Sequence, residues 1–341
     1  MTGVLSLLRV EECDYPRLHA LLSPFLPESL TILGTYEQHR DQPFNLPVWA
    51  SFYLREPHPP LFAVFTLGFA SAGHQSRFFC SAESSPDQLT PEQEAFVMAF
   101  IETSLRTAFG YLAKTSPVGQ TTQQSELLIG SIHEKWHNCL RTLPFAKLRT
   151  PCRKVLLPPS AVQAFAQGAQ DERLPQDARV TQLEEGDLEA VVGGSDIARP
   201  TGYVNSRLEQ SLCIRAQGLD GKEIPAAWII VHSDSSLGML EVVKAFRRRG
   251  LGGELMRRIV ALRVARAEQR AKHAPHEPKD MTEGWNMVDV REGNARGAGF
   301  YGNLEGWKHA WLCRWATFTA PDLSTDSRCR TNAGGPRIFW T

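Results

Sequence analysis

The sequence predicts an α/β protein of two domains. Three observations lead to this fold class. Strand and helix patterns alternate through the N-terminal half, a break rich in Pro, Gly, Gln and charge follows at residues 158–177, and a fresh strand–helix alternation begins after it. The 341 residues suffice for two domains with a sizeable buried core, and a hydrophobic content of 42% is typical of a globular chain.

The N-terminal half is expected to contain four short strands, two helices before residue 110, and a further helix and strand after it. The clearest helix start is at residues 90–93 (Thr-Pro-Glu-Gln), where a capping threonine precedes a proline at the first helical position. The expected strands are residues 4–9, 29–36, 48–54, 61–65 and 154–157, the helices are 15–26, 90–109 and 127–143, and 116–125 is a polar loop.

The second half repeats the alternation. Asp220-Gly221 lies at the centre of a predicted hairpin turn, residues 219–223. Strands are expected at residues 179–183, 213–217 and 224–233, and helices at 184–192 and 203–211. The predicted domains are therefore 1–175 and 176–319, followed by a tail at 320–341 that is expected to be disordered.

Composition narrows the function classes. Lys+Arg and Asp+Glu both number 37, which argues against a nucleic-acid partner. The seven cysteines are scattered and form no CxxC pair, so buried free thiols are expected rather than disulfides or a metal site. No run of 18 apolar residues and no basic leader are present, so neither a membrane partner nor secretion is expected, and the predicted location is cytoplasmic.

Residues 238–262 carry the strongest functional signal. A strand at 239–243 is followed by residues 247–253 (RRRGLGG) and then by a helix with one apolar face. A glycine-rich turn that enters a helix exposes backbone N–H groups at the positive end of the helix dipole, which favours an anion. The turn is neither GxGxxG nor a Walker loop, so nucleotide-binding folds fit poorly. The alternative is that the glycines serve only the turn.

A second motif follows at residues 285–307. Residues 285–290 are predicted to form a strand, and Asn294 can cap a helix at 295–303. Tyr301 lies seven residues after Asn294, on about the same face of that helix.

The two motifs together resemble the GNAT acyltransferase superfamily, whose coenzyme A loop has the pattern R/Q-x-x-G-x-G/A. The matching residues are Arg247, Gly250 and Gly252 in the loop, and Asn294, Phe300, Tyr301, Gly306 and Trp307 in the second motif. The resemblance implies a GNAT fold, a mixed, splayed β-sheet flanked by helices. It also implies an acyl-CoA or acetyl-CoA co-substrate without a metal.

A narrower resemblance points to the glycine N-acyltransferase family, which pairs an N-terminal domain with a C-terminal GNAT domain. The similar segments are residues 29–35, 43–46, 203–207 and 224–228. This resemblance implies that the first domain is a second α/β domain, for which a GNAT-like fold stays open.

The resemblance also implies the roles of individual residues. The N–H of Val242 would polarise the acyl carbonyl, and the amides from Arg249 to Gly253 would hold the pyrophosphate. Tyr301 would protonate or hydrogen-bond the leaving thiolate, the alternative being a packed core tyrosine. The residues expected to bind acyl-CoA are Val242, Val243, Arg247, Arg248, Arg249, Gly250, Leu251, Gly252, Gly253, Asn294 and Tyr301.

One departure from the family concerns the general base. The position of the family's Glu is occupied by Ser236, which cannot accept the proton of the amine. Asp234 and His232 are the candidates, because both keep the same strand parity, and Glu241 lies farther along. For each, a solvated strand-end residue is the alternative.

The function expected from the sequence is an acyl-CoA-dependent N-acyltransferase that acts on the amine of a small molecule, with an amino acid as one option. Two alternatives stay open. One is a GNAT acetyltransferase that acts on a protein or a polyamine, and the other is a catalytically weakened coenzyme A-binding protein. The sequence leaves the acyl chain, the acceptor and the oligomeric state open.

Overall fold

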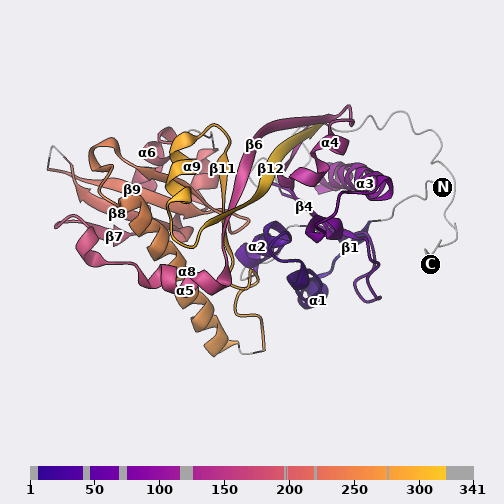
Figure 1. Ribbon diagram of the computed structural model, residues 1–341, viewed down its shortest axis with the longest axis horizontal. Coiled ribbons are helices and arrows are strands. Elements are labelled where there is room, and N and C mark those ends of the chain that lie inside the picture. Colours follow the sequence, from indigo (N-terminus) through magenta and orange to yellow (C-terminus); the bar gives the residue numbers. More distant parts are fainter. Residues whose placement is uncertain are drawn as a thin grey trace.

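The computed structural model describes residues 7–40, 47–68, 75–115, 126–195, 197, 199–218, 221–274 and 276–319. Figure 1 shows an elongated molecule, with the N-terminal elements at one end and the later α/β elements at the other. Two long strands, β6 (Ala146–Leu157) and β12 (Lys308–Thr319), run between the two ends.

A four-stranded antiparallel sheet forms the centre of the N-terminal part. Its order is β1 (Leu8–Arg9), β2 (Val48–Ala50), β3 (Ala63–Thr66) and β4 (Arg77–Cys80). All residues of β2, β3 and β4 are buried. The helices of this part are α1 (Tyr15–Leu22), α2 (Leu30–His39) and α3 (Pro91–Thr115). Apolar side chains from these strands and helices form two clusters of buried residues that include both sides of the sheet.

The predicted start of α3 is confirmed. Thr90 Oγ1 accepts a hydrogen bond from the Gln93 amide (3.3 Å), and the Thr90 amide donates to Gln93 Oε1 (2.9 Å). This reciprocal pair satisfies donors that the first turn of a helix leaves free.

An eight-stranded sheet has the order β5-β12-β6-β11-β10-β9-β8-β7. Besides β6 and β12, its strands are β5 (Glu126–His133), β7 (Arg179–Thr181), β8 (Ser211–Gln217), β9 (Glu223–Val231), β10 (Leu237–Val242) and β11 (Asn286–Arg291). Within the described strands, the pair β10–β11 is parallel and the other pairs are antiparallel. The sheet is therefore mixed, as predicted.

Helices cover both faces of this sheet. The side chains of β9 alternate, so that Ala227 and Ile229 face α5 (Pro159–Gln167) and α8 (Leu251–His273), while Trp228 and Ile230 face α6 (Leu188–Gly193) and α7 (Thr201–Asn205). The remaining helices are α4 (His137–Leu140) and α9 (Ala295–Gly302). The predicted strands that correspond to β7 to β11, and the helix after the glycine-rich turn, are confirmed.

Two predicted elements are wrong. Residues 29–36, predicted as a strand, lie in α2, where seven of ten residues are buried. Because this helix is covered on nearly every side, its sequence has no polar face and resembles a buried strand. Residues 127–143, predicted as a helix, form β5 and then the short α4. Residues 127–133 of β5 are buried or half-buried on both faces, so they lack the polar and apolar alternation of a half-exposed strand, and their pattern does not distinguish a strand from a helix.

The eight-stranded sheet takes strands from both sides of the predicted boundary between residues 175 and 176. β5 and β6 precede the boundary, and β12, which pairs with both, follows it. The segment 158–177 contains α5, which packs on α8. The division into two domains stays a prediction.

Some predictions fall outside the described residues, namely the loop at 116–125, Asp220 of the hairpin turn, the motif at 43–46 and the tail at 320–341. Six cysteines are described as free thiols, and all but Cys13 are buried, as expected. In the described ranges, no helix combines the length and apolarity needed to cross a membrane.

Candidate functional site

The parallel strands β10 and β11 meet at one end and then diverge. Their pairing is at Leu237 and Val288. A bulge between Gly238 and Glu241 bends β10, and Met239 has a φ of +50° within it. Beyond the pairing, both strands line a cavity of about 1090 Å³. The predicted splay of the sheet is thus a V-shaped opening with a strand on each side.

One backbone donor on β10 faces this opening. The amide of Val243 donates to Ala226 O of β9 (2.9 Å). Because successive N–H groups of a strand point to opposite edges, the N–H of Val242 is directed away from β9, toward β11. The carbonyl of Val242 accepts a hydrogen bond from Arg247 Nε (2.8 Å), and Val242 lines the cavity. An N–H donor is therefore available at the position expected for polarising a carbonyl.

The glycine-rich turn lies between β10 and α8. Gly250 caps α8 with a φ of +81°, a conformation that favours glycine. Within the part of the chain that the structure describes, the backbone N–H groups of residues 248–253 have no acceptor, and the first amide bonded in α8 is that of Glu254, to Gly250 O (3.1 Å). Free amides at the positive end of a 23-residue helix can bind an anion.

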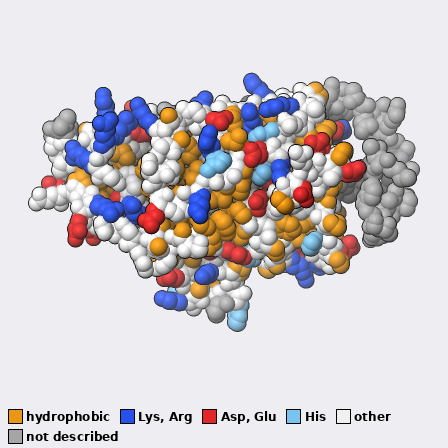
Figure 2. All heavy atoms as spheres, viewed as in Figure 1, with side chains coloured by type: hydrophobic (Ala, Val, Ile, Leu, Met, Phe, Trp, Pro, Cys, Tyr) orange, Lys and Arg blue, Asp and Glu red, His pale blue; other side chains and the backbone are white. Residues whose placement is uncertain are grey.

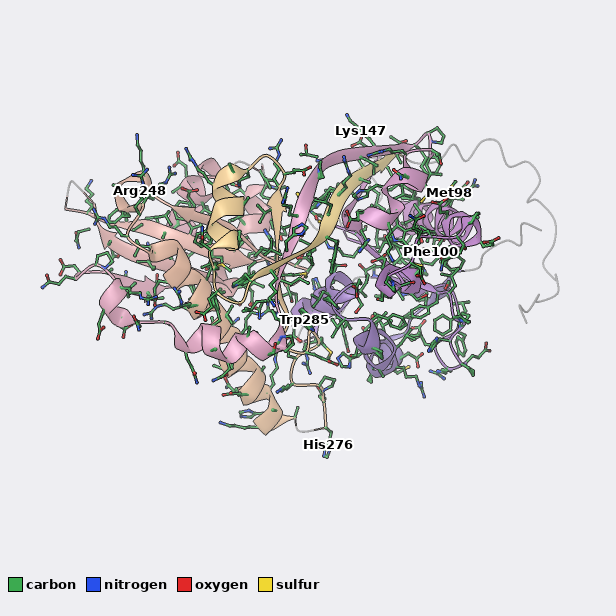
Figure 3. The ribbon with its side chains drawn as sticks, viewed as in Figure 1. Met98, Phe100, Lys147, Arg248, His276 and Trp285 are labelled. Atoms are coloured by element: carbon green, nitrogen blue, oxygen red, sulfur yellow. The ribbon has the colours of Figure 1, made fainter. Side chains whose placement is uncertain are left out.

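Basic side chains surround this turn. The side chains of residues 247–249 are exposed. Figure 2 shows Lys and Arg side chains gathered at the upper left of the molecule, the end at which Figure 3 labels Arg248. Arg247 also forms an ion pair with Glu241 (2.8 Å). Glu241 is the third residue that the sequence offered as a general base, and this ion pair engages its carboxylate.

The second predicted motif forms α9 on the other side of the opening. Asn294 Oδ1 accepts a hydrogen bond from the Gly297 amide (2.9 Å), so the predicted cap is confirmed. A Cβ atom on Gly252 would lie 3.2 Å from the ring of Phe300, so glycine at this position allows the start of α8 to approach α9 closely.

Tyr301 lines the cavity, although only 8% of its surface is exposed. Its ring packs against Phe300 and Trp307, with centroid distances of 5.0 and 5.9 Å. Among the described residues, its hydroxyl has no hydrogen-bond partner. Burial raises the pKa of Tyr301 above its ordinary value, so the hydroxyl keeps its proton at neutral pH.

Asp234 lies at the floor of the cavity and is 2% exposed. Its Oδ2 accepts from Arg77 Nη2 (2.7 Å) and Nε (3.1 Å), and its Oδ1 accepts from Ser236 Oγ (2.6 Å). Burial alone would raise the pKa of Asp234, but the cations Arg77 and Lys154 outweigh burial and hold the pKa well below its usual range. Asp234 is therefore ionised and weakly basic, which disfavours its predicted role as the base.

His232, the other base candidate, lies beside Tyr203. Its Nδ1 is 2.9 Å from Tyr203 Oη, which also accepts from the amide of Ser233 (3.3 Å). A Cβ on Gly238 would come within 2.3 Å of His232 Nε2, so the ring lies directly against β10. Burial, with Arg199 nearby, lowers the pKa of His232 to about 3. The imidazole is therefore neutral and lines the cavity.

Several residues of the cavity carry no sequence motif and were not predicted. Arg77 comes from the N-terminal part, and the lining residue Asp289 pairs with Lys154 (2.7 Å), which does not itself line the cavity. The further lining residues of this kind are Gln75, Arg199 and Trp315. Arg77 directly precedes the apolar residues 78–80 in the sequence. A charged residue in so apolar a strand implies a buried partner, and this is the one sequence signal that could have identified Arg77 as a residue of the cavity.

Three cations at or next to the cavity differ in their ion pairs. Arg77 is paired with Asp234, and Lys154 with Asp289. Arg199 lies with its guanidinium carbon 5.6 Å from the ring centroid of Tyr203 and has no ion-pair partner in the described ranges. Unlike Arg77 and Lys154, but like the exposed lining residues Arg291 and Arg296, Arg199 therefore leaves a positive charge that a bound group could neutralise. The described residues include no cluster of three metal-ligating side chains.

Comparison with known proteins agrees with this architecture. Residues 218–281, which include β9, β10, the glycine-rich turn and α8, match the family model of FR47-like proteins. A solved Drosophila protein is similar with a TM-score of 0.59 and 16% identity, over 93% of this chain and 99% of that one. No curated protein matches significantly.

Two further solved structures are similar to a lesser degree. A GCN5-related N-acetyltransferase from Sphaerobacter thermophilus has a TM-score of 0.49 at 10% identity, with 94% of this chain and 97% of that one covered. A putative acetyltransferase of the GNAT family from Novosphingobium aromaticivorans has a TM-score of 0.37 at 15% identity, with 57% and 75% covered.

The chain has a GNAT fold, with a mixed sheet that splays between β10 and β11 and is flanked by helices. The FR47-like match over the coenzyme A motif supports the GNAT superfamily. The resemblance to glycine N-acyltransferases stays a prediction.

Proposed function

We propose that this protein is an acyl-CoA-dependent N-acyltransferase that acts on the amine of a small molecule. The observation that carries the proposal is the joint presence, at one cavity, of diverging parallel strands and a glycine-rich turn with free amides. The residues fit acyl-CoA, because the amides of residues 248–253 and the exposed arginines suit a pyrophosphate, while the opening between β10 and β11 can admit an extended chain.

In the proposed reaction, the amine nitrogen attacks the thioester carbonyl carbon, and the C–S bond then breaks. The N–H of Val242 stabilises the negative charge that develops on the carbonyl oxygen. Tyr301 donates a hydrogen bond or its proton to the departing thiolate, and its raised pKa means that the hydroxyl is protonated before the step. The nitrogen loses one proton, which returns through the site or the solvent to the Tyr301 oxygen, so that an amide, a free thiol and the starting form of the protein result.

The neutral imidazole of His232 is the better of the two candidates for accepting the proton of the amine. Asp234 is bound on both oxygens, by Arg77 and Ser236. His232 has a single described side-chain partner, Tyr203, and its ring lies along β10 near the bulge. Since its pKa is about 3, His232 is a weak base, and we propose that the amine reaches the site already largely deprotonated.

The cation of Arg199 favours an acceptor that carries a carboxylate as well as an amine. An amino acid has both groups on one carbon, so a carboxylate on Arg199 would leave the amine within the same cavity. Arg199 and His232 are coupled closely enough that the charge of Arg199 contributes to the lowered pKa of His232. Among small-molecule amines, amino acids are therefore the acceptors that we propose.

A mass-spectrometric screen tests the proposal. The purified chain is incubated with acetyl-CoA, benzoyl-CoA and longer acyl-CoA donors, each with a panel of amino acids, simple amines, polyamines and lysine peptides. We expect N-acylated amino acids together with free coenzyme A. Products only from polyamines or peptides would contradict the small-molecule assignment, and coenzyme A binding by calorimetry without any product would indicate a binding protein.

A further inference from the structure

The turn between β9 and β10 is enclosed by residues from the N-terminal part. This turn, residues 232–236, contains His232 and Asp234 and places both at the floor of the cavity. Gly34 of α2 lies directly against it, because a Cβ atom on Gly34 would come within 2.1 Å of Asp234 O and 3.0 Å of Ser235 Cβ. Only glycine permits so close an approach of helix and turn.

Hydrogen bonds fix the same contact. Ser235 Oγ donates to Gly34 O (2.9 Å) and accepts from Gln38 Nε2 of α2 (3.1 Å). The turn itself is strained, since Ser235 has a φ of +63°. Arg263 of α8 donates to Ser235 O (3.0 Å). The turn is therefore held between the two parts of the molecule rather than by its own hairpin alone.

Arg77 supplies the second contact, and it is itself held in place. Its Nη1 donates to Gln75 Oε1 (2.8 Å), which also accepts from Trp315 Nε1 of β12 (2.6 Å). A Cβ on Gly130 of β5 would lie 2.0 Å from Arg77 Nη1, so glycine at this position leaves room for the guanidinium. Arg77 then reaches Asp234, 157 residues away, through two hydrogen bonds.

We propose that the N-terminal part is a clamp on the β9–β10 turn, with Gly34 and Arg77 as positioning residues that fix Asp234 and His232 for acyl transfer. The inference rests on the proposed function. Without Arg77, the carboxylate of Asp234 would be buried without its main counterion, which is costly enough to displace it. A side chain on Gly34 would push Asp234 O away. Neither residue lies at the glycine-rich turn, so coenzyme A binding does not depend on them.

The first test compares two glycine substitutions in helices of the N-terminal part. Gly34→Ala should lower kcat/KM for the acceptor by about ten-fold or more, because small displacements of reacting groups are costly. The Kd for coenzyme A should stay within about two-fold, since the anion site is distant. Gly110→Ala in α3 is the control, because nothing lies within 4 Å of a Cβ there, and it should match the wild type. A normal acceptor kcat/KM in Gly34→Ala would overturn the proposal.

The second test is a double-mutant cycle on the ion pair. If Arg77 acts through Asp234, then Arg77→Gln and Asp234→Asn should each reduce kcat/KM for the acceptor, and the double variant should be no worse than the poorer single variant. Arg77→Lys should restore part of the loss. Additive losses, or a parallel loss of coenzyme A affinity, would show general destabilisation and contradict the clamp.

A third measurement separates the clamp from the acyltransferase proposal. Amide hydrogen exchange of the β9–β10 turn should accelerate by about ten-fold or more in Gly34→Ala and Arg77→Gln, and stay unchanged in Gly110→Ala. This result would support the clamp even if the wild type formed no product. Unchanged exchange in both clamp variants would overturn the clamp while leaving the proposed activity intact.

Discussion

His232 Nδ1 lies 2.9 Å from Tyr203 Oη, and the two rings stack with centroids 5.9 Å apart. This pair is buried beside the cavity, and the pKa of His232 is lowered to about 3. His232 is consequently neutral throughout the pH range in which an enzyme assay is practical.

The pH dependence of the rate should therefore follow the acceptor. Since His232 and Asp234 both have lowered pKa values, neither changes its protonation state between about pH 5 and 9. The ascending limb of kcat/KM should shift with the pKa of the amine when acceptors of different basicity are compared. A limb that stays near pH 6–7 for every acceptor, about the range of an ordinary histidine, would contradict this reasoning.

Tyr301→Phe should lower kcat by about ten-fold or more, because general acid catalysis contributes roughly 10²–10⁴-fold. KM for acyl-CoA should change little, since only the hydroxyl is lost and the ring still packs against Trp307. Stopped assays of coenzyme A release measure both constants. Tyr53→Phe, at an exposed tyrosine, is the matched control. An unchanged kcat with a rate-limiting chemical step would leave Tyr301 as a core residue only.

Gly250→Asp should weaken coenzyme A binding by about ten-fold or more, because a carboxylate would face the phosphates at the start of α8. Gly250→Asn is the control. Asn has nearly the same shape and tolerates the φ of +81° about as well, but it carries no charge. Calorimetric titration with coenzyme A should show a clear loss for Asp and a small one for Asn. Equal affinities for the two variants would remove the anion site from the turn.

Arg199→Gln should discriminate between acceptors. If Arg199 binds the carboxylate of an amino acid, KM for that amino acid should rise by about ten-fold or more. The internal control is the amine that has the same side chain as the amino acid but lacks its carboxylate. KM for this amine should change by less than about two-fold. A uniform loss for both acceptors would contradict carboxylate recognition by Arg199.

Glu83 gives a prediction for stability. Burial raises its pKa from an ordinary 4.5 to about 8, although the indole of Trp136 and the amide of Cys80 donate to its Oε1. Between pH 4.5 and about 8, the folded state therefore keeps a proton on Glu83 that the unfolded chain loses. The neutral carboxyl stabilises the folded state fully below pH 4.5, and this contribution to the free energy of unfolding is lost as the pH rises through about 8.

Glu83→Gln should remove this dependence. Between pH 5 and 8, the melting temperature of the wild type should fall relative to that of the variant by about 5 °C or more. The comparison with Gln at each pH cancels the opposite contribution of His133, whose lowered pKa favours stability at higher pH. A constant difference between the two proteins across this range would show that Glu83 is ionised in the folded state.

The sequence predicted the local geometry of the glycine-rich turn and of the Asn294 cap better than the surroundings of Asp234 and His232. The glycine-rich turn and the Asn294 cap are local features, so their residue types alone define the geometry. Arg77 and Asp234 meet only through the packing of α2 and β4 on the β9–β10 turn, which no local pattern encodes. The secondary structure of α2 and β5 was also predicted wrongly. Most residues of both elements are buried, and burial on both sides removes the polar face that distinguishes a helix from a strand.

The position of β6 between β11 and β12 of the large sheet limits where the chain could be divided into separately folding fragments. A fragment that starts at residue 176 would keep β11 and β12 but lose the strand that lies between them and pairs with both. β11 would then present one open edge of unpaired amides and carbonyls, and β12, which also loses β5, would present two, which invites association with other chains. Transfer of the part after residue 175 to another protein would therefore have to include β5 and β6, residues 126–133 and 146–157, as added strands or as tethered peptides.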